Sequence, residues 1–181
     1  MYNLEKGDSF NLEKSLTNIH VGLGWDVSVD NFDCDVSVFM INENHKLPNP
    51  GCFVFYNNLT SSDGSVKHLG DNRTGDGDGD DEVINIELNK VDQQIVQIIF
   101  VVTVHKAAEK GFHFGMIDNA FIRIEDKNNG KELCRYSLNN QYSGSDSLQV
   151  GRVYRYGDEW NFEAMGDGFS GGLASVLNIY K

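Results

Sequence analysis

Short runs of alternating hydrophobic and polar residues, separated by turn residues, recur along the whole chain. The run Cys34–Ile41 alternates and is rich in β-branched residues, and Val83–Leu88 places Ile84, Ile86 and Leu88 on one face. Because strand side chains point alternately to two faces, this pattern predicts strands with a buried face. Other strand-like runs are Cys52–Tyr56, Ile98–His105, Ala120–Ile124, Glu132–Leu138, Leu148–Tyr156 and Trp160–Ala164. Many short strands at this spacing predict an all-β fold, a β-sandwich of two antiparallel sheets.

Helical patterns are scarce. The segment Leu173–Tyr180 repeats apolar residues at helical spacing and predicts a short C-terminal helix, whereas Lys106–Lys110 can form one turn. Two segments, 42–51 and 57–82, are expected to be long loops, and loops of that length usually bind something or move. There is no linker and no second composition regime, so residues 1–181 are expected to form a single domain.

The segment from Asp71 to Glu82 is unusually acidic: six of its twelve residues are carboxylates, against one arginine. Glycines at 75, 77 and 79 alternate with acids, and glycine lets a chain fold tightly and turn its carbonyls inward. Two unit charges about 4 Å apart repel by roughly 1 kcal/mol in water and roughly 4 kcal/mol at an effective dielectric of about 20. The segment is therefore expected either to stay solvated or to close around a cation.

The ligands in this segment indicate which cation. They are hard oxygens without histidine or cysteine, which disfavours zinc and copper. Ca²⁺ accepts about 6–8 oxygens in loose geometry, whereas Mg²⁺ requires a strict octahedron. We therefore expect Ca²⁺, as one ion or two adjacent ions. An EF-hand is excluded, because Asp81 stands where that loop needs glycine and the exit segment Val83–Leu88 alternates as a strand.

A second acidic element precedes this segment in the chain. Asp33 and Asp35 are two residues apart at a strand entrance, so both point to one face, while Cys34 and Val36 point to the other. Two readings stay open for this pair: additional ligands for the metal, or a solvated strand edge.

Charge and composition exclude several classes of function. The formal net charge is −12, which argues against binding nucleic acid or an anionic membrane surface, because both depend on Lys and Arg. No apolar run reaches the roughly 18 residues of a membrane span, and Met1–Lys6 does not resemble a secretory signal. The three cysteines have neither zinc nor disulfide spacing. A cytoplasmic protein with reduced, buried thiols is expected.

The chain resembles the TerD family of tellurite-resistance and general stress proteins, over essentially its whole length. The motifs that carry the resemblance are Gly22–Asp26, Phe32–Ser37, Phe55–Leu59, Ser62–Val66, Gly70–Gly75, Gly77–Glu82, Val101–His105, Asn119–Arg123 and Gly168–Ala174. The resemblance implies a β-sandwich that binds Ca²⁺ through the acidic loop. The metal-site positions it implies are Asp33, Asp35, Asp71, Asn72, Asp76, Asp78, Asp80, Asp81 and Glu82.

Two functions of different class remain open. The first is a non-enzymatic Ca²⁺-binding stress-response module, implicated by the resemblance in tellurite and chemical stress resistance. It would act through other stress-resistance proteins, within a membrane-associated assembly but without inserting into the membrane itself. The second is a metal-dependent enzyme in which the ion activates water. The first is favoured because the acidic segment contains carboxylates needed as ligands and no histidine or cysteine. His105, at the end of a buried strand, is expected to be structural.

Overall fold

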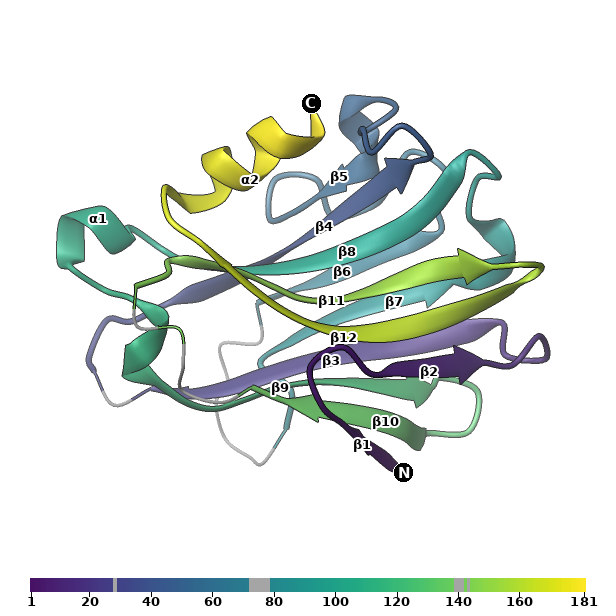
Figure 1. The fold of residues 1–181 in the computed structure, drawn as a ribbon, viewed down its shortest axis with the longest axis horizontal. Coiled ribbons are helices and arrows are strands. Elements are labelled where there is room, and N and C mark those ends of the chain that lie inside the picture. The colour runs from purple at the N-terminus through teal and green to yellow at the C-terminus, as the bar shows by residue number, and fades with distance from the viewer. Residues whose placement is uncertain (28, 72–78, 139–141, 143) are drawn as a thin grey trace.

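The computed structural model describes residues 1–27, 29–70, 79–138, 142 and 144–181, together with the backbone of residue 71. Strands dominate, and they form two six-stranded sheets that lie face to face (Figure 1). The first sheet has the order β1-β10-β9-β3-β7-β6, with the bounds Tyr2–Leu4, Lys131–Ser137, Ile117–Asp126, Asn18–Val27, Glu82–Glu87 and Val66–Asp71. The second has the order β2-β12-β11-β8-β4-β5, with the bounds Ser9–Leu12, Glu159–Phe169, Ser147–Tyr156, Ile95–Val104, Cys34–Asn42 and Phe53–Val54. The predicted β-sandwich is confirmed, and its named strands pair antiparallel except for β1, which is parallel to β10.

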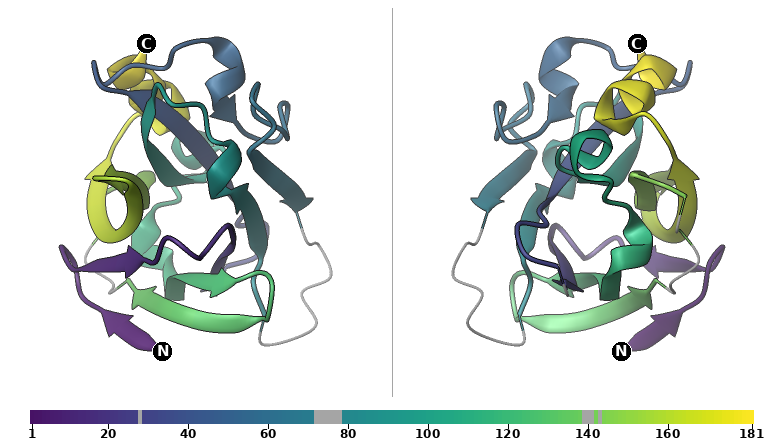
Figure 2. Two further views of the ribbon diagram at one scale, coloured as in Figure 1. Left: turned by 90° about the vertical axis from the view of Figure 1, so that its right-hand side faces the viewer. Right: turned by 90° about the vertical axis from the view of Figure 1, so that its left-hand side faces the viewer.

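The core lies between the two sheets, and the alternation along β4 shows how it is built (Figure 2). Cys34, Val36, Val38 and Met40 point into the space between the sheets and are buried there. The predicted division of this strand into two faces is confirmed. Its other face carries Phe39, which belongs to a second apolar cluster on the outside of the sheet.

Helix α2, Gly172–Tyr180, covers that outer cluster (Figure 1). Its apolar residues at helical spacing all belong to the cluster, namely Leu173, Val176, Leu177 and Tyr180, so the predicted C-terminal helix is confirmed. The side chain of Asp146 accepts hydrogen bonds from the backbone N–H groups of Gly171 (3.1 Å) and Gly172 (2.9 Å), two donors that the start of a helix leaves without partners. The predicted single turn is α1, Ala107–Lys110.

The segment 57–82, expected to be a loop, contains strand β6 and so differs from the prediction. Pairing with β7 sets it in the sheet, with Val66 opposite Ile86 and His68 opposite Ile84. Val66 and His68 are both buried between the sheets. Short 3-10 turns at Pro50–Cys52, Leu88–Lys90 and Phe114–Met116 complete the regular structure. Within the described ranges, the helices are all too short or too polar to cross a membrane.

Candidate metal centre

Strands β4 and β7, from different sheets, begin at the same end of the sandwich (Figure 1), and acidic residues lie at or just before both starts. Burial raises the pKa of the Cys34 thiol well above its ordinary value, and the nearby charges of Asp33, Asp35, Asp81 and Glu82 raise it further. The charge of each of these four carboxylates therefore acts at the start of β4. The raised pKa favours the protonated thiol, whereas the thiolate is the form that acts as a nucleophile or metal ligand.

Asp33 and Asp35 flank Cys34 in sequence, and both are more accessible than the thiol between them. The Asp35 carboxylate lies 3.7 Å from His105 Nδ1, and the carbonyl of Asp33 accepts a hydrogen bond of 2.8 Å from the backbone N–H of His105. The structural role expected for His105 is therefore to join the start of β4 to the end of β8. The imidazole is about half exposed.

Asp80, Asp81 and Glu82 are consecutive, yet their carboxylates point in three directions. Asp80 lies on the outer face of the first sheet, where both of its oxygens accept hydrogen bonds from Arg123, Nε to Oδ1 at 2.8 Å and Nη2 to Oδ2 at 2.7 Å. His20 Nε2 is 3.1 Å from the same Oδ2. Burial alone would raise the pKa of Asp80, but the hydrogen bonds from His20 and Arg123 outweigh it and lower the pKa to about 2.

Asp81 lies directly before β7, where the pairing of that strand with β3 ends. Its Oδ2 accepts a hydrogen bond of 2.7 Å from the backbone N–H of Trp25, and its own N–H donates to the carbonyl of Leu23 at 2.8 Å. The pairing of β3 with β7 ends at Leu23 and Glu82, and the pairing of β3 with β9 shifts register between Gly24 and Asp26. Asp81 thus provides an acceptor for the backbone N–H of Trp25, which lies beyond the last residue pair of β3 and β7.

Glu82 points into the sandwich, on the same face of β7 as Ile84 and Ile86, and is 2% exposed. Its Oε2 accepts a hydrogen bond of 2.9 Å from the backbone N–H of Val36 in the opposite sheet and lies 3.1 Å from His68 Nε2. Burial raises the pKa of Glu82, and the opposing hydrogen bonds from His68 and Val36 only partly offset it. Glu82 therefore connects the two sheets directly.

The oxygen chemistry of these groups fits a hard divalent cation. In the part of the chain that the structure describes, however, no three His, Cys, Asp or Glu side chains are placed to hold an ion by themselves. Asn72, Asp76 and Asp78 lie outside the described residues, and Asp71 is described only by its backbone in β6. A Ca²⁺ site at this end therefore needs donors from the segment 71–78 in addition to Asp33, Asp35 and Asp81.

Sequence reasoning missed the groups that hold the acidic residues in place, namely His20, Gly22, His68 and Arg123. Arg123 interrupts the apolar run Ala120–Ile124, and a lone cation in a strand whose neighbours are apolar is a signal that it has an acidic partner. The partner itself is 43 residues away in the chain, so its identity comes only from the fold.

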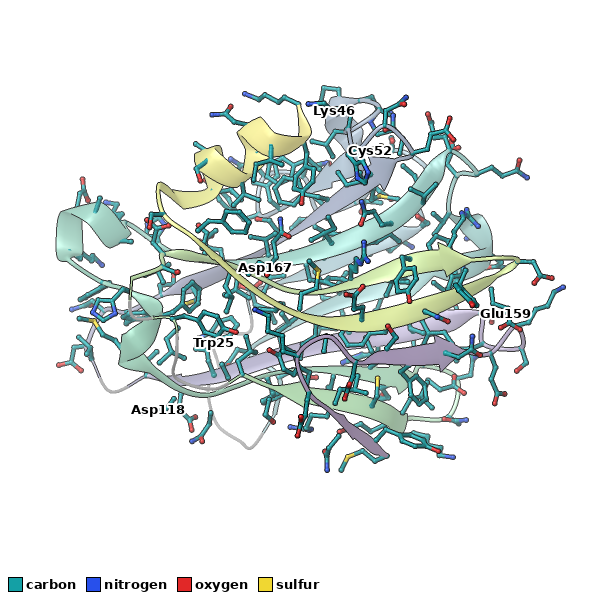
Figure 3. The ribbon with its side chains drawn as sticks, in the orientation of Figure 1. Trp25, Lys46, Cys52, Asp118, Glu159 and Asp167 are labelled. Carbon is teal, nitrogen blue, oxygen red and sulfur yellow. The ribbon has the colours of Figure 1, made fainter. Side chains whose placement is uncertain are left out.

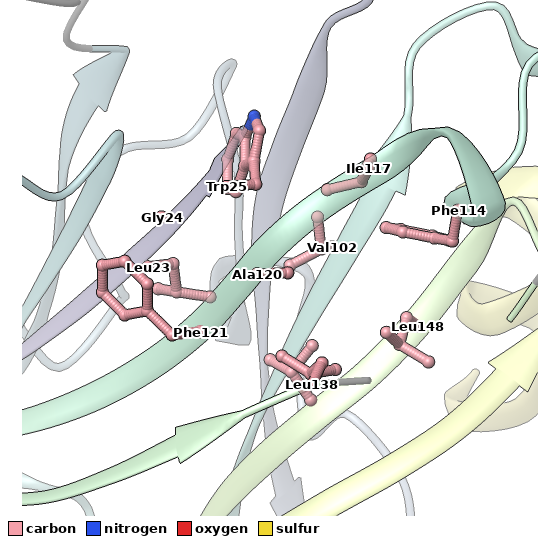
Figure 4. Close-up of a pocket in the computed structure, with 11 residues that line it drawn as sticks. Leu23, Gly24, Trp25, Val102, Phe114, Ile117, Ala120, Phe121, Leu138 and Leu148 are labelled. Atoms are coloured by element: carbon pink, nitrogen blue, oxygen red, sulfur yellow. The ribbon is translucent and has the colours of Figure 1, made fainter. Parts of the chain in front are cut away.

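Trp25 lines a small apolar cavity (Figures 3 and 4). The cavity lies inside the same end of the sandwich and is also lined by Leu23, Phe114, Ile117 and Leu148. Its volume of about 20 Å³ is enough for roughly one water molecule. This space does not accommodate an organic ligand.

The fold and this acidic end define a two-sheet β-sandwich with a candidate cation site. A TerD domain model matches residues 1–180, and the chain belongs to the TerD family. It is 48% identical to a tellurium resistance protein TerD of Serratia marcescens and 41% identical to general stress protein 16U of Bacillus subtilis (strain 168). Each alignment covers 98% of this chain and 95% of the relative. The fold also matches the crystal structure of a homologue of telluride resistance protein (TerD) from Streptomyces coelicolor A3(2), with a TM-score of 0.69 and 21% identity over 90% of this chain and 95% of that chain.

Proposed function

We propose that this protein is a Ca²⁺-binding module of the stress response that contributes to resistance against tellurium compounds and other chemical stress. The names of its relatives support the second half of this proposal. The observation that carries the first half is the hydrogen bond of 2.9 Å from the Val36 N–H to Glu82 Oε2, which brings the start of β7 and the preceding Asp81 beside Asp35 at the start of β4. One or two ions would be held by Asp33, Asp35 and Asp81 together with donors from 71–78.

Bound Ca²⁺ would neutralise carboxylates that otherwise repel one another across the two sheets. Asp33 and Asp35 lie at the start of β4 in the second sheet, and Asp81 lies just before β7 in the first sheet. An ion bound to all three would therefore join the two sheets. The proposed role is therefore to fix this end of the module in the shape that other stress-resistance proteins bind.

A groove beside Asp35 is the surface we propose for such a partner. Its volume is about 380 Å³, and Tyr56, His105, Lys106 and Leu173 are among the residues that line it. Tyr56 is 61% exposed, and an exposed aromatic ring beside charged groups is typical of a contact surface. Because Asp35 lines the groove and belongs to the proposed ligand set, cation binding and partner binding would be linked.

Calorimetric titration with Ca²⁺, with Mg²⁺ as competitor, tests the metal proposal and gives the number of ions. We expect Asp81→Asn to weaken Ca²⁺ binding and Asp30→Asn, an exposed control, to leave it unchanged. No heat of binding, or equal affinity for both cations, would contradict the proposal. Restoring tellurite tolerance to a host that lacks the protein tests the stress role, and Asp81→Asn should fail to restore it.

The alternative function, a metal-dependent enzyme, needs a base that can reach the ion. His68 has a buried side chain and already contacts Glu82 and the Val36 carbonyl, so it is poorly placed for that role. His105, next to Asp35, is the better candidate. For the binding module, any loss of tolerance in His105→Gln should be matched by a loss of Ca²⁺ affinity, stability or partner binding, because His105 lines the proposed groove beside Asp35. Loss of tolerance with unchanged Ca²⁺ affinity, stability and partner binding would favour the enzyme.

A further inference from the structure

The carboxylate of Asp80 rests directly on Gly22. A Cβ atom at position 22 would lie 2.3 Å from the carboxylate, a distance that real Cβ contacts do not reach. Ile19, Val21 and Leu23 point into the core, so the place that a side chain of residue 22 would take is on the outer face of the sheet. Arg123 is the register partner of Gly22 on β9 and holds the carboxylate from the side. Glycine at 22 therefore makes the space that Asp80 fills.

We propose that Asp80 is not a Ca²⁺ ligand but an anchor, and that Asp80, Arg123 and Gly22 together position Asp81 for the ion. This inference rests on the proposed Ca²⁺ site. Both oxygens of Asp80 are occupied by one guanidinium, and the Asp80 and Arg123 side chains are only 6% and 18% exposed. A cation binding to the same carboxylate would have to displace a paired arginine of like charge.

The anchor acts on the next residue in the chain. Asp81 donates its N–H to Leu23 and accepts from the N–H of Trp25, so its backbone and carboxylate are both set against β3. Leu23 and Trp25 lie in β3 just after Gly22, the residue that the Asp80 carboxylate contacts. Substituting a residue that holds a metal ligand in position typically lowers metal affinity by about 10- to 100-fold.

Replacing Arg123 separates this inference from a purely electrostatic account, because the two predict opposite signs. Loss of a positive charge near a cation site strengthens cation binding by Coulomb's law. Loss of the anchor weakens it. Arg123→Met should therefore bind Ca²⁺ about tenfold more weakly than the native chain. Arg152→Met is the matched control, since Arg152 forms a comparable ion pair with Glu163 in the second sheet, away from Asp80 and Arg123.

Gly22→Ala provides a second test that changes no charge. Its backbone is compatible with alanine, since the φ of Gly22 is not positive, and the added methyl group displaces the Asp80 carboxylate. Ca²⁺ affinity should again fall by about tenfold. Gly144→Ala, whose Cβ would meet no described residue within 4 Å, should bind like the native chain. Unchanged or tighter binding by both Arg123→Met and Gly22→Ala would overturn the inference.

Hydrogen exchange in EDTA distinguishes failure of the anchor from failure of the Ca²⁺ proposal. The Asp81 amide, bonded to the Leu23 carbonyl, should exchange about tenfold faster in Arg123→Met and Gly22→Ala than in the native chain and the two controls. If the native chain binds no Ca²⁺ but these rates change as expected, the anchor stands and the metal site fails. If the Asp81 amide stays equally protected in both variants, the anchor is wrong whatever the affinity.

Discussion

Glu82 and His68 lie side by side between the two sheets, with Glu82 Oε2 3.1 Å from His68 Nε2, and both contact the backbone of Val36. Among the described residues, β4 pairs with β5 at Val38 and Phe39 alone, and none of them forms a strand beside this edge of β4 at Val36. The two side chains serve that edge instead: Glu82 accepts from the Val36 N–H, and His68 Nε2 is 3.2 Å from the Val36 carbonyl. Glu82, which lies beside the acidic segment, thus has a structural role that does not depend on metal binding.

This relationship predicts a loss of stability that does not depend on metal. In EDTA, Glu82→Ala should lower the free energy of unfolding by about 2–3 kcal/mol, because it leaves the buried Val36 N–H without its acceptor and removes one of the two acceptors near His68 Nε2. Urea denaturation followed by circular dichroism measures the change. Glu87→Ala, in the same strand but paired with Lys90 at the surface, should leave stability nearly unchanged, because exposed ion pairs contribute little. Equal effects of the two substitutions would contradict the structural role of Glu82.

Ca²⁺ should stabilise the folded protein. Ligand binding to the native state alone contributes about 2.7 kcal/mol at a free concentration of 100 times the dissociation constant. For a chain of this size, that corresponds to a rise of about 5–10 °C in melting temperature. Differential scanning calorimetry in EDTA, in Ca²⁺ and in equimolar Mg²⁺ measures it. Coincident curves in EDTA and in millimolar Ca²⁺ would remove the basis for a calcium module.

Asp63 organises a turn far from the metal centre and predicts a pH dependence. Its Oδ1 accepts from Ser61 Oγ, Ser65 N and Ser65 Oγ, and its Oδ2 accepts from Asp92 N. Burial alone would raise the pKa of Asp63, but these hydrogen bonds outweigh it and lower the pKa below 3.8. Because the folded value is the lower one, the contribution of the charge is complete above the unfolded pKa and is lost as pH falls through the folded pKa.

Asp63→Asn should therefore cost about 1–2 kcal/mol of unfolding free energy at pH 7, and the difference from the native chain should shrink as pH falls below about 4. Urea denaturation between pH 3 and pH 7 measures the difference. Asp30→Asn serves as a control, since Asp30 is exposed. This variant should be as stable as the native chain at each pH tested. A difference between native and Asp63→Asn that grows toward low pH would show that the sign is wrong.

The faces of individual strands were predictable from sequence, but the assembly of the metal centre was not. The alternation of β4 placed Asp35 and Cys34 on opposite faces, and the strand after Glu82 excluded an EF-hand. Strand β3 was not predicted because Gly22 and Gly24 interrupt its apolar pattern. The fold explains both glycines, since Gly22 makes room for Asp80 and Gly24 for the ring of Phe121. Partners 43 and 46 residues apart, as for Asp80 and Glu82, are set by sheet pairing and leave no local signal.

The three cysteines predict how the protein can and cannot deal with chemical stress. Cys34, Cys52 and Cys134 are free thiols that are at most 4% exposed. Burial raises the pKa of all three, that of Cys134 to about 12. Since the thiolate is the reactive form, the folded protein should react with a thiol reagent at pH 8 only as fast as it opens. Absorbance with Ellman's reagent measures the rate, and urea-unfolded protein should give three equivalents at once.

Cys52→Ser separates packing from chemistry in the same experiment. Cys52 is buried and its Sγ lies 3.8 Å from Ser62 Oγ, so serine can keep this contact while the thiol is lost. This variant should retain Ca²⁺ affinity and tellurite tolerance, because the proposed role depends on carboxylates and not on thiols. Rapid labelling of the native chain, or loss of tolerance in stably folded Cys52→Ser, would instead indicate that a thiol takes part in resistance.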